Sequence, residues 1–562
     1  MKRFKLLAIL LAILLVSAGC KSEEATVTTK EETPSAVNSD FISLTMVKPE
    51  TINPIINKDK SVGYITNLIY DGLFTIDENY DIVPQLVDEF GVSQDGSKIN
   101  IKLKDATWHD GTPVTSRDVA FTVDLIKKNS QSPYKGFVEN ISSVSITSDK
   151  EFSIRFANNY AFSMDTLIFP IVSKNQLNSV SSSSLSDYKN NLVGNGPYKI
   201  KEYKERESIT LSVNENYYEE FPDTMKNIKV TMVPDKESQV AMVTALQSDI
   251  GNIALDDLSK FQEKEFNVTN YEGRGYESIL FNYNNAFLRD INFRKAIAHA
   301  INRNQILEEG YMEDATIVNF PLNSNSKYYD KSIEPLEYDK EKAKKYLGSV
   351  QPVSEDELKA IQEKELQDNK SEGENQDKVN SEDASSTDET NKNEKKEKTP
   401  EEVKKMISEL NLKIIVNKDN SERKKSGYVI VNNLKAAGIK STLVELSSEE
   451  MDKALSEKNY DLALVGWELS IVPDATSIIE NSGYSDEQLS NYLSSLKNAT
   501  SQNQIQDIYK SIQNYVKDNV AFISLVIRDN YVVTNRRLEG KIAPNDYDVY
   551  EGISNLNIKK SK

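Results

Sequence analysis

The sequence predicts an α/β protein with more than one hydrophobic core. Short runs rich in β-branched residues have the composition of strands: FISLTMV at 41–47, KINIKL at 98–103 and EFSIRF at 151–156. Between two of them, SRDVAFTVDLIKKN at 116–129 has the apolar spacing of a helix. The chain shows no internal repeat with a period of about 20 to 50 residues, which disfavours solenoids and propellers.

Residues 1–19 have the three parts of a secretory signal peptide. Cations at 2–5 precede an apolar run at 6–16 and small residues at 17–19. The apolar run is too short to cross roughly 30 Å of hydrocarbon as a helix. We therefore expect residues 1–19 to direct export.

Cys20 is the only cysteine and directly follows these small residues. This arrangement resembles the lipobox of bacterial lipoproteins, although Ser17 stands where leucine is usual. The resemblance implies a diacylglyceryl thioether on Cys20, and more than one acyl chain makes a stable anchor. Residues 21–40 are rich in Ser, Thr, Glu and Lys, so we expect 20–40 to be the lipidated cysteine and a flexible stalk. With one cysteine, the chain has no intramolecular disulfide.

The net charge limits the partners of the chain. It is -19 for the whole chain, and removing the three cations of the leader makes it about -22. A charge of this sign argues against nucleic acid and against electrostatic attachment to anionic lipid. We expect a monomer on the extracytoplasmic side of the cell membrane that touches the membrane only through its lipid anchor.

A charged segment interrupts the second half of the chain. Residues 353–400 contain 15 acidic and 8 basic side chains and almost no apolar ones after Leu366. Such a composition does not form a packed element. We predict a disordered or weakly helical insertion there.

The sequence disfavours catalysis. Cys20, His109 and His299 are the only cysteine and histidines, which leaves no thiol nucleophile and no His-rich zinc site. No G-x-S-x-G, H-E-x-x-H or phosphate-loop motif is present. We therefore predict no enzyme activity, no catalytic or metal-binding residues and no cofactor, and we interpret both histidines as structural.

Ten blocks, in this order, give the chain a resemblance to a known family. They are TINP at 51–54, IYDGLF at 69–74, VPQLVDEFGVSQDGSKINIKLKDATWHDGTPVTSRDVAFTV at 83–123, GNGPYKI at 194–200, NENYYE at 214–219, ALQSDIGNI at 245–253, FNYNNAFLRDINFRKAIAHAINR at 281–303, YDKEKAKKYL at 338–347, NYDLALVGWELSIVPD at 459–474 and VAFISLVIRDNYVVTNRRLEG at 520–540. They resemble the family 5 extracellular solute-binding proteins, the oligopeptide- and dipeptide-binding proteins of ABC importers. The likeness covers nearly all of 41–550 except the insertion.

The resemblance implies a two-lobed, type II periplasmic-binding-protein-like fold with crossing strands and an extra subdomain on the first lobe. It also implies capture of peptides for an ABC permease and ATPase by closure of the lobes. The domain boundaries that we expect are 41–70, 193–275 and 526–562 for the core of the first lobe, 71–192 for its subdomain, and 276–525 for the second lobe.

The resemblance also implies where ligand binds. In this family the peptide backbone pairs like an added strand. The candidates are the strand at 464–470 and the loop at 59–61, with Arg274 and Tyr276 where the chain crosses between lobes. The predicted ligand-binding residues are Asp59, Lys60, Ser61, Arg274, Tyr276, Val465, Gly466, Trp467, Glu468 and Ser470.

One position departs from the family pattern. Peptide-binding relatives have an aspartate three residues after the tryptophan, which holds the α-amino group of the ligand, whereas this chain has Ser470. A hydroxyl does not supply the charge-assisted bond that an ammonium needs. Glu468 replaces that aspartate only if the strand bends, because it points to the opposite face. N-blocked or longer peptides, a non-peptide solute such as a metal chelate, sugar or opine, and a peptide-signal sensor all remain open.

Overall fold

The computed structural model describes residues 41–180, 185, 192–222, 226–261, 264–374 and 398–559. The predicted signal peptide, Cys20 and the stalk lie outside the described residues. None of the described helices has the length and apolar character needed to span a membrane.

A four-stranded sheet holds the start of the described chain. Its order is β1 (Phe41–Val47), β10 (Asn227–Val233), β9 (Ser208–Val213) and β8 (Tyr198–Lys204). The first pair is parallel and the others are antiparallel. Alternate residues of β1 are fully buried, which is the period-2 pattern of a strand that covers a core. FISLTMV is therefore a strand, as predicted.

A second, antiparallel sheet forms most of the segment predicted as a subdomain. Its order is β4 (Val87–Val92), β5 (Lys98–Leu103), β7 (Glu151–Phe156) and β6 (Ile141–Ile146). Helix α3 (Ser116–Lys128) contacts this sheet, and Asp118 accepts hydrogen bonds at 2.9 Å from both the N–H and the hydroxyl of Thr115 at its start. The two strands and the helix predicted here are confirmed.

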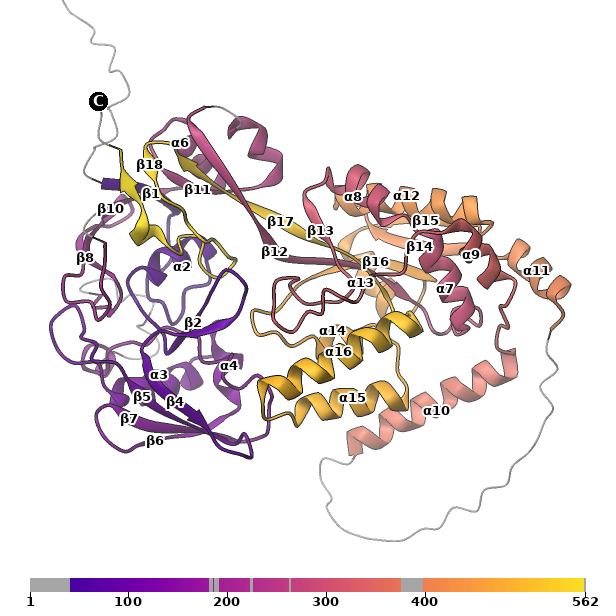
Figure 1. The fold of residues 1–562 in the computed structure, drawn as a ribbon, viewed down its shortest axis with the longest axis horizontal. Coiled ribbons are helices and arrows are strands. Elements are labelled where there is room, and N and C mark those ends of the chain that lie inside the picture. Colours follow the sequence, from indigo (N-terminus) through magenta and orange to yellow (C-terminus); the bar gives the residue numbers. More distant parts are fainter. Residues whose placement is uncertain are drawn as a thin grey trace, which may run out of the picture. The chain divides into compact units, whose positions relative to one another are not determined.

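The third sheet contains the two longest strands of the described chain. β12 (Phe266–Phe281) and β17 (Ile523–Asn535) pair antiparallel, from Phe266 opposite Asn535 to Ile279 opposite Ile523. Figure 1 shows both strands running from the neighbourhood of β1 and β11 (Ile250–Ile253) to that of β16. The other members are β11, which pairs with β17, and β16 (Leu462–Glu468), β14 (Leu412–Asn417), β15 (Ser441–Leu446) and β13 (Ala315–Ile317).

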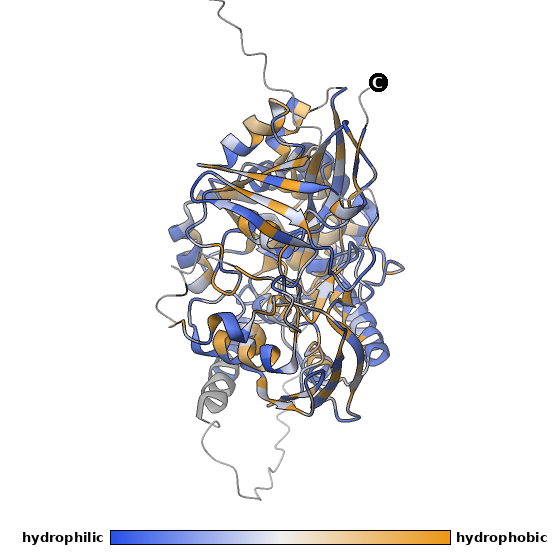
Figure 2. Ribbon diagram, turned by 90° about the vertical axis from the view of Figure 1, so that its left-hand side faces the viewer, coloured by the Kyte–Doolittle hydropathy of each residue, from blue (hydrophilic) through white to orange (hydrophobic). Residues whose placement is uncertain are grey.

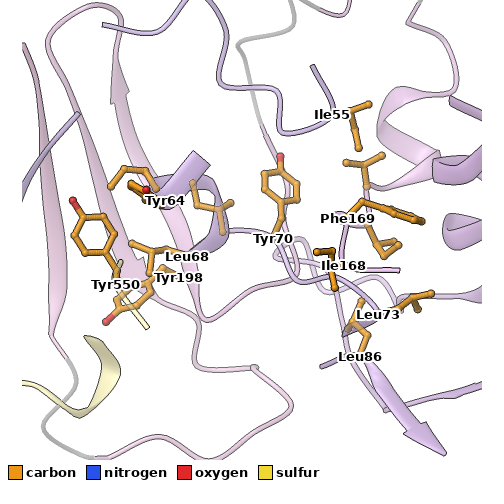
Figure 3. Packing of buried hydrophobic residues seen from close by; sticks show 14 of the residues in the cluster. Ile55, Tyr64, Leu68, Tyr70, Leu73, Leu86, Ile168, Phe169, Tyr198 and Tyr550 are labelled. Carbon is orange, nitrogen blue, oxygen red and sulfur yellow. The ribbon is translucent and has the colours of Figure 1, made fainter. Parts of the chain in front are cut away.

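The long strands join separate hydrophobic cores. Ile279 and Ile523 belong to a core built from residues of the range 279–526, whereas a larger core is built from residues of the ranges 42–250 and 532–558. Figure 3 shows part of the larger core, and Figure 2 shows that hydropathy changes from residue to residue along the strands. The predicted boundaries at 275/276 and 525/526 fall inside β12 and β17, as crossing strands require; the boundaries themselves stay predictions.

Helices pack around these sheets, and short strands and 3₁₀ turns complete the fold. The helices are α2 (Lys60–Asn67), α4 (Lys135–Glu139), α5 (Lys174–Leu177), α6 (Lys236–Thr244), α7 (Ile291–Ala300), α8 (Arg303–Tyr311), α9 (Lys340–Leu347), α10 (Glu355–Glu374), α11 (Pro400–Glu409), α12 (Ser421–Ala437), α13 (Ser448–Ser456), α14 (Thr476–Asn481), α15 (Glu487–Lys497) and α16 (Gln502–Asn519). The short pieces are β2 (Phe74–Ile76), β3 (Ile82–Pro84), η2 (Leu255–Phe261), β18 (Leu538–Glu539), η3 (Ile553–Asn555) and β19 (Asn557–Ile558).

Three of the sequence blocks meet around Ile69. Its carbonyl accepts hydrogen bonds from the N–H groups of Asn195 and Gly196. A Cβ on Gly194 would stand 1.9 Å from the same carbonyl oxygen, so only glycine fits there. His109 joins the contact, because its Nδ1 accepts from Gly194 N at 3.2 Å and its Nε2 donates to the Gly196 carbonyl at 3.0 Å. These blocks therefore define the fold, and His109 is structural.

The charged insertion is partly helical. Helix α10 covers Glu355–Glu374 and α11 begins at Pro400, with Thr399 as its cap. Between them, residues 375–397 lie outside the described residues. The first part of the predicted insertion is therefore one helix of 20 residues.

Candidate functional site

The carboxyl half of β16 has an edge with no strand beside it among the described residues. The ladder between β14 and β16 joins only Ile414 with Leu462 and Ile415 with Ala463. On the other side, β12 pairs with the whole of β16, as far as Gly275 opposite Glu468. Two consecutive residues beyond the ladder, Gly466 and Trp467, are half-buried, and Glu468 is exposed. The predicted strand is thus confirmed over Leu464–Glu468, and it ends before Ser470.

Hydrogen-bond direction shows which groups face this edge. Leu469 N donates to the Arg274 carbonyl, directly after the last pair of the ladder. Because main-chain groups alternate sides along a strand, the N–H and C=O groups of Trp467 and Val465 also point towards β12. The N–H and C=O groups of Gly466 and Glu468 therefore point to the open edge. An extended peptide has the geometry to pair there.

Trp467 lies over Tyr276 on the neighbouring strand. The two rings stack with centroids 6.1 Å apart and an interplanar angle of 27°. Tyr276 is fully buried and its hydroxyl shares a hydrogen bond of 2.7 Å with Ser524. Trp467 is half-buried against two apolar clusters. Tyr276 thus supports Trp467 from the core side, and the roles predicted for both in ligand binding stay predictions.

Gly466 lies against the side chains of Glu277 and Arg423. Glu277 is buried, and Arg423 Nε donates to its Oε2 at 2.5 Å. A Cβ on Gly466 would stand 2.3 Å from Arg423 and 2.7 Å from Glu277. Val465 is also buried. Gly466 therefore contributes main-chain groups to the open edge and has no room for a side chain.

The segment at 59–61 is the start of a helix rather than the loop that we predicted. Asp59 caps α2, and its carboxylate accepts from Val62 N at 3.1 Å and from the Ser61 hydroxyl at 2.6 Å. The hydroxyl of Ser61 in turn accepts from Val47 N at 3.1 Å. An aspartate cap fixes the first turn of a helix, which is why the segment does not remain a loop.

Lys60 nevertheless meets the second-lobe strand. Its Nζ lies 2.5 Å from Glu468 Oε1, and both side chains are more than half exposed. Partial burial raises the pKa of Glu468, but the hydrogen bond from Lys60 and the charge of Arg274 outweigh it and leave that pKa below its usual value. The structure therefore brings together two predicted residues that are 408 positions apart.

Arg274 is the centre of a polar cluster with Glu468, Leu469 and Asp546. It donates to Asp546 Oδ2 at 3.2 Å, to the Leu469 carbonyl at 2.7 Å and to Glu468 Oε1 at 2.5 Å. The side chains of Arg274 and Asp546 are 13% and 7% exposed, so this pair is largely shielded from water. Arg274 thus donates hydrogen bonds to carboxylates through several of its N–H groups, and these carboxylates belong to the protein itself.

Ser470 lines a small pocket beside this cluster. Arg274, Leu469 and Ser470 form its wall together with Tyr80, Asn323 and Asp474, and its volume of about 20 Å³ holds roughly one water. Asp546, Tyr80 and Asp474 were not among the predicted site residues. Asp474 ends one of the sequence blocks, whereas Asp546 lies in a polar stretch with no motif to single it out.

No group of three His, Cys, Asp or Glu side chains among the described residues could hold a metal ion.

Comparison with known proteins agrees with the resemblance seen in the sequence. Residues 81–357 match the family model of bacterial extracellular solute-binding proteins, family 5 Middle. The oligopeptide-binding protein AppA of Bacillus subtilis is 23% identical, over 96% of this chain and 96% of AppA. These matches are to proteins described as binding proteins, not as enzymes.

Solved structures show the fold. The ABC transporter substrate-binding protein CtaP of Listeria monocytogenes has a TM-score of 0.70 and 22% identity, over 93% of this chain and 100% of CtaP. AppA of Bacillus subtilis in complex with a nonapeptide has a TM-score of 0.57 and 20% identity, over 92% of this chain and 99% of AppA. The predicted type II periplasmic-binding-protein fold is confirmed.

Proposed function

Because the chain belongs, through residues 81–357, to the family 5 extracellular solute-binding proteins, we propose that it captures peptides and delivers them to an ABC importer. The open edge of β16 is the observation that carries this proposal. A peptide added to that edge gains main-chain hydrogen bonds whatever its side chains are, which suits a carrier of varied peptides.

Peptide capture requires movement of the lobes. The pocket beside Arg274 has space for about one water, and Lys60 on α2 reaches Glu468 at the open edge. The contact between Lys60 and Glu468 must therefore break before a peptide reaches β16. It is exposed and worth at most about 1 kcal/mol, so breaking it costs little, and we propose that the ligand-free chain in solution is mostly open. A ligand that contacts both lobes then favours the closed arrangement.

The charges near Ser470 favour peptides without a free α-amino group. The carboxylate of Glu468 is already bound by Lys60 and Arg274, and that of Asp546 by Arg274. Ser470 adds no charge. Both carboxylates of the cluster thus already have a cation, and we expect N-blocked peptides, or long peptides whose amino group lies beyond the cluster, where Asp474 on the wall of the same pocket accepts hydrogen bonds, among the described residues, only from Tyr160 and Thr476.

The remaining parts of the proposal come from the sequence. We propose that the chain is a monomer, is held at the extracytoplasmic face of the cell membrane by lipid on Cys20, and releases its ligand unchanged. Its partners would be an ABC permease and ATPase. Capture of a non-peptide solute is the alternative that the following experiment separates, and loss of peptide uptake in a deletion strain would distinguish delivery to an importer from presentation of a signal peptide to a receptor.

Calorimetric titration with a pool of random nonapeptides, in free and N-acetylated forms, tests the proposal. We expect binding, with the acetylated pool at least as tight as the free one. Failure of both pools to bind would favour a non-peptide solute. Mass spectrometry of the recovered pool should find every peptide intact, and cleavage would indicate an enzyme.

A pair of variants tests the open edge itself. Glu468→Pro removes an N–H that points to this edge and leaves the bonds to β12 in place, whereas Glu468→Ala removes only the side chain. We expect the proline variant to bind the pool about tenfold more weakly than the alanine variant, since one main-chain hydrogen bond is lost. Equal affinities would show that the ligand does not pair with β16.

A further inference from the structure

A second and larger cavity lies wholly within residues of the first lobe and the C-terminal segment. Its volume is about 290 Å³, and its lining comes from residues 67–85, from Pro170, from residues 197–221 and from residues 547–554. It shares no lining residue with the pocket beside Arg274. Several of its residues, including Leu68, Tyr198 and Tyr550, appear in Figure 3. A cavity of this size admits a small organic molecule.

The lining of this cavity is acidic. Asp71, Glu219, Asp548 and Glu551 contribute to it, and no Lys, Arg or His does. Asp71 is fully buried and Asp548 nearly so. Among the described residues, Lys104 is bound to Glu219 at 2.7 Å, and no ion pair reaches the other three carboxylates. Buried carboxylates without a cation are costly.

Hydrogen bonds hold the Asp71 carboxylate in place without neutralising it. Gln85 Nε2 donates to its Oδ1 at 2.9 Å, and the Tyr218 hydroxyl donates to its Oδ2 at 2.8 Å. Burial raises the pKa of Asp71 to about 7 and also raises those of Asp548 and Glu551, with Glu219 adding repulsion to Asp71 and Glu551. The cavity therefore resists full ionisation of its carboxylates, and a bound cation would relieve this resistance.

Aromatic rings form much of the remaining wall. Tyr217 and Phe221 stack with centroids 4.8 Å apart and planes 12° apart, and Tyr70, Tyr547 and Tyr550 also line the cavity. Ring faces attract organic cations and pack against alkyl groups. An aromatic wall with carboxylates suits a cation that carries an apolar body.

The hydroxyl of Tyr198 has no partner among the described residues. Tyr198 is fully buried and lines the same cavity, although its hydroxyl is neither bonded to protein nor exposed. Buried hydroxyls are normally hydrogen-bonded, and one left without a partner costs about 1 to 3 kcal/mol. A ligand with a hydrogen-bond donor would satisfy it. This observation is independent of the carboxylates and points to the same occupant.

We propose that this cavity, between Asp71, Tyr198, Tyr217 and Glu551, is a second ligand site that binds a small alkylguanidinium or alkylammonium cation. The carboxylates receive the charged N–H groups, the Tyr198 hydroxyl accepts another, and the aromatic rings pack against the alkyl chain. The site is separate from the peptide edge at β16.

Titration of the full chain with n-butylguanidinium, followed by calorimetry, tests the site. Its neutral isostere n-butylurea is the matched control ligand, since it keeps the shape and loses the charge. We expect n-butylguanidinium to bind at millimolar concentration or below and n-butylurea to bind at least tenfold more weakly. Absence of guanidinium binding, or equal binding of the two, would overturn the proposal.

Variants locate the binding. Glu551→Gln should weaken n-butylguanidinium binding about tenfold, whereas Glu220→Gln, an exposed change outside the lining, should leave it unchanged. Trp467→Ala should also leave it unchanged, because Trp467 belongs to the other site. If Trp467→Ala abolishes guanidinium binding while Glu551→Gln does not, the cation binds at the peptide edge and the proposed site is wrong.

The variant Tyr198→Phe distinguishes a role of the Tyr198 hydroxyl in ligand binding from a role in the stability of the fold. Removal of a hydroxyl without a partner should leave the melting temperature of the ligand-free chain unchanged or higher, and should weaken guanidinium binding about fivefold. A lower melting temperature with unchanged affinity would show that the hydroxyl serves the fold instead.

Discussion

Replacement of Arg274 by methionine tests whether the cluster beside Ser470 is held by this single side chain. Methionine keeps the length and apolar volume of the stem and removes every donor. Asp546 would lose its nearer cation while remaining buried, with only Lys60 Nζ left at 3.9 Å, and the Leu469 carbonyl would lose a charged donor at 2.7 Å. Removing one partner of a buried ion pair costs about 3 to 5 kcal/mol, and the exposed arm to Glu468 adds at most about 1 kcal/mol.

The loss of stability is partly offset, because the Asn530 amide still donates a hydrogen bond to Asp546 at 2.7 Å. We therefore expect Arg274→Met to lower the free energy of unfolding by about 3 kcal/mol. Urea unfolding of the ligand-free chain, followed by circular dichroism, measures it. Lys60→Met is the matched control, since Lys60 binds the same Glu468 oxygen from an exposed position and should cost less than about 1 kcal/mol. If the two variants lose equal stability, Arg274 does not organise the cluster.

Three further predictions concern the fold and the edge strand. Burial lowers the pKa of His109 from 6.5 to about 4, so its stabilising contribution of about 3 kcal/mol is complete above pH 6.5 and is lost as the pH falls towards 4. The free energies of unfolding in urea of the wild type and of His109→Gln should therefore converge over that range. A constant difference between them would refute the structural role of a neutral His109. Asp118→Ala leaves the donors of Thr115 and Lys174 without their acceptor and should cost about 2 kcal/mol in urea unfolding, and a change under about 0.5 kcal/mol would contradict the capping role. Gly466→Ala forces Arg423 away from Glu277 and should lower the melting temperature, whereas an unchanged melting temperature would mean that the close approach is not real.

The sequence was informative where local chemistry decides the structure. Alternating β-branched residues predicted β1, β5 and β7, and the apolar spacing of residues 116–129 predicted α3. The long matching blocks predicted the fold and the crossing strands. Two of these blocks contain Gly194 and His109, and both residues are required where the chain approaches Ile69 closely.

The candidate site was harder to predict, because its parts come from distant positions. The motif at 464–470 located an edge strand, yet its openness depends on where β14 stops pairing with it. Asp59 was the first residue of the loop predicted at 59–61, and its capping hydrogen bonds make this segment the start of a helix. Asp546 had no signal at all, since an aspartate in a polar stretch gains meaning only when β12 brings Arg274 to it.

A peptide that binds between the lobes should draw them together. Small-angle scattering of the chain, alone and with the N-acetylated nonapeptide pool in excess, measures this directly. We expect a smaller radius of gyration when the pool is present and a smaller decrease in Glu468→Pro at the same concentration, because its affinity is about tenfold weaker. A radius that stays constant in the wild type while calorimetry records peptide binding would contradict it.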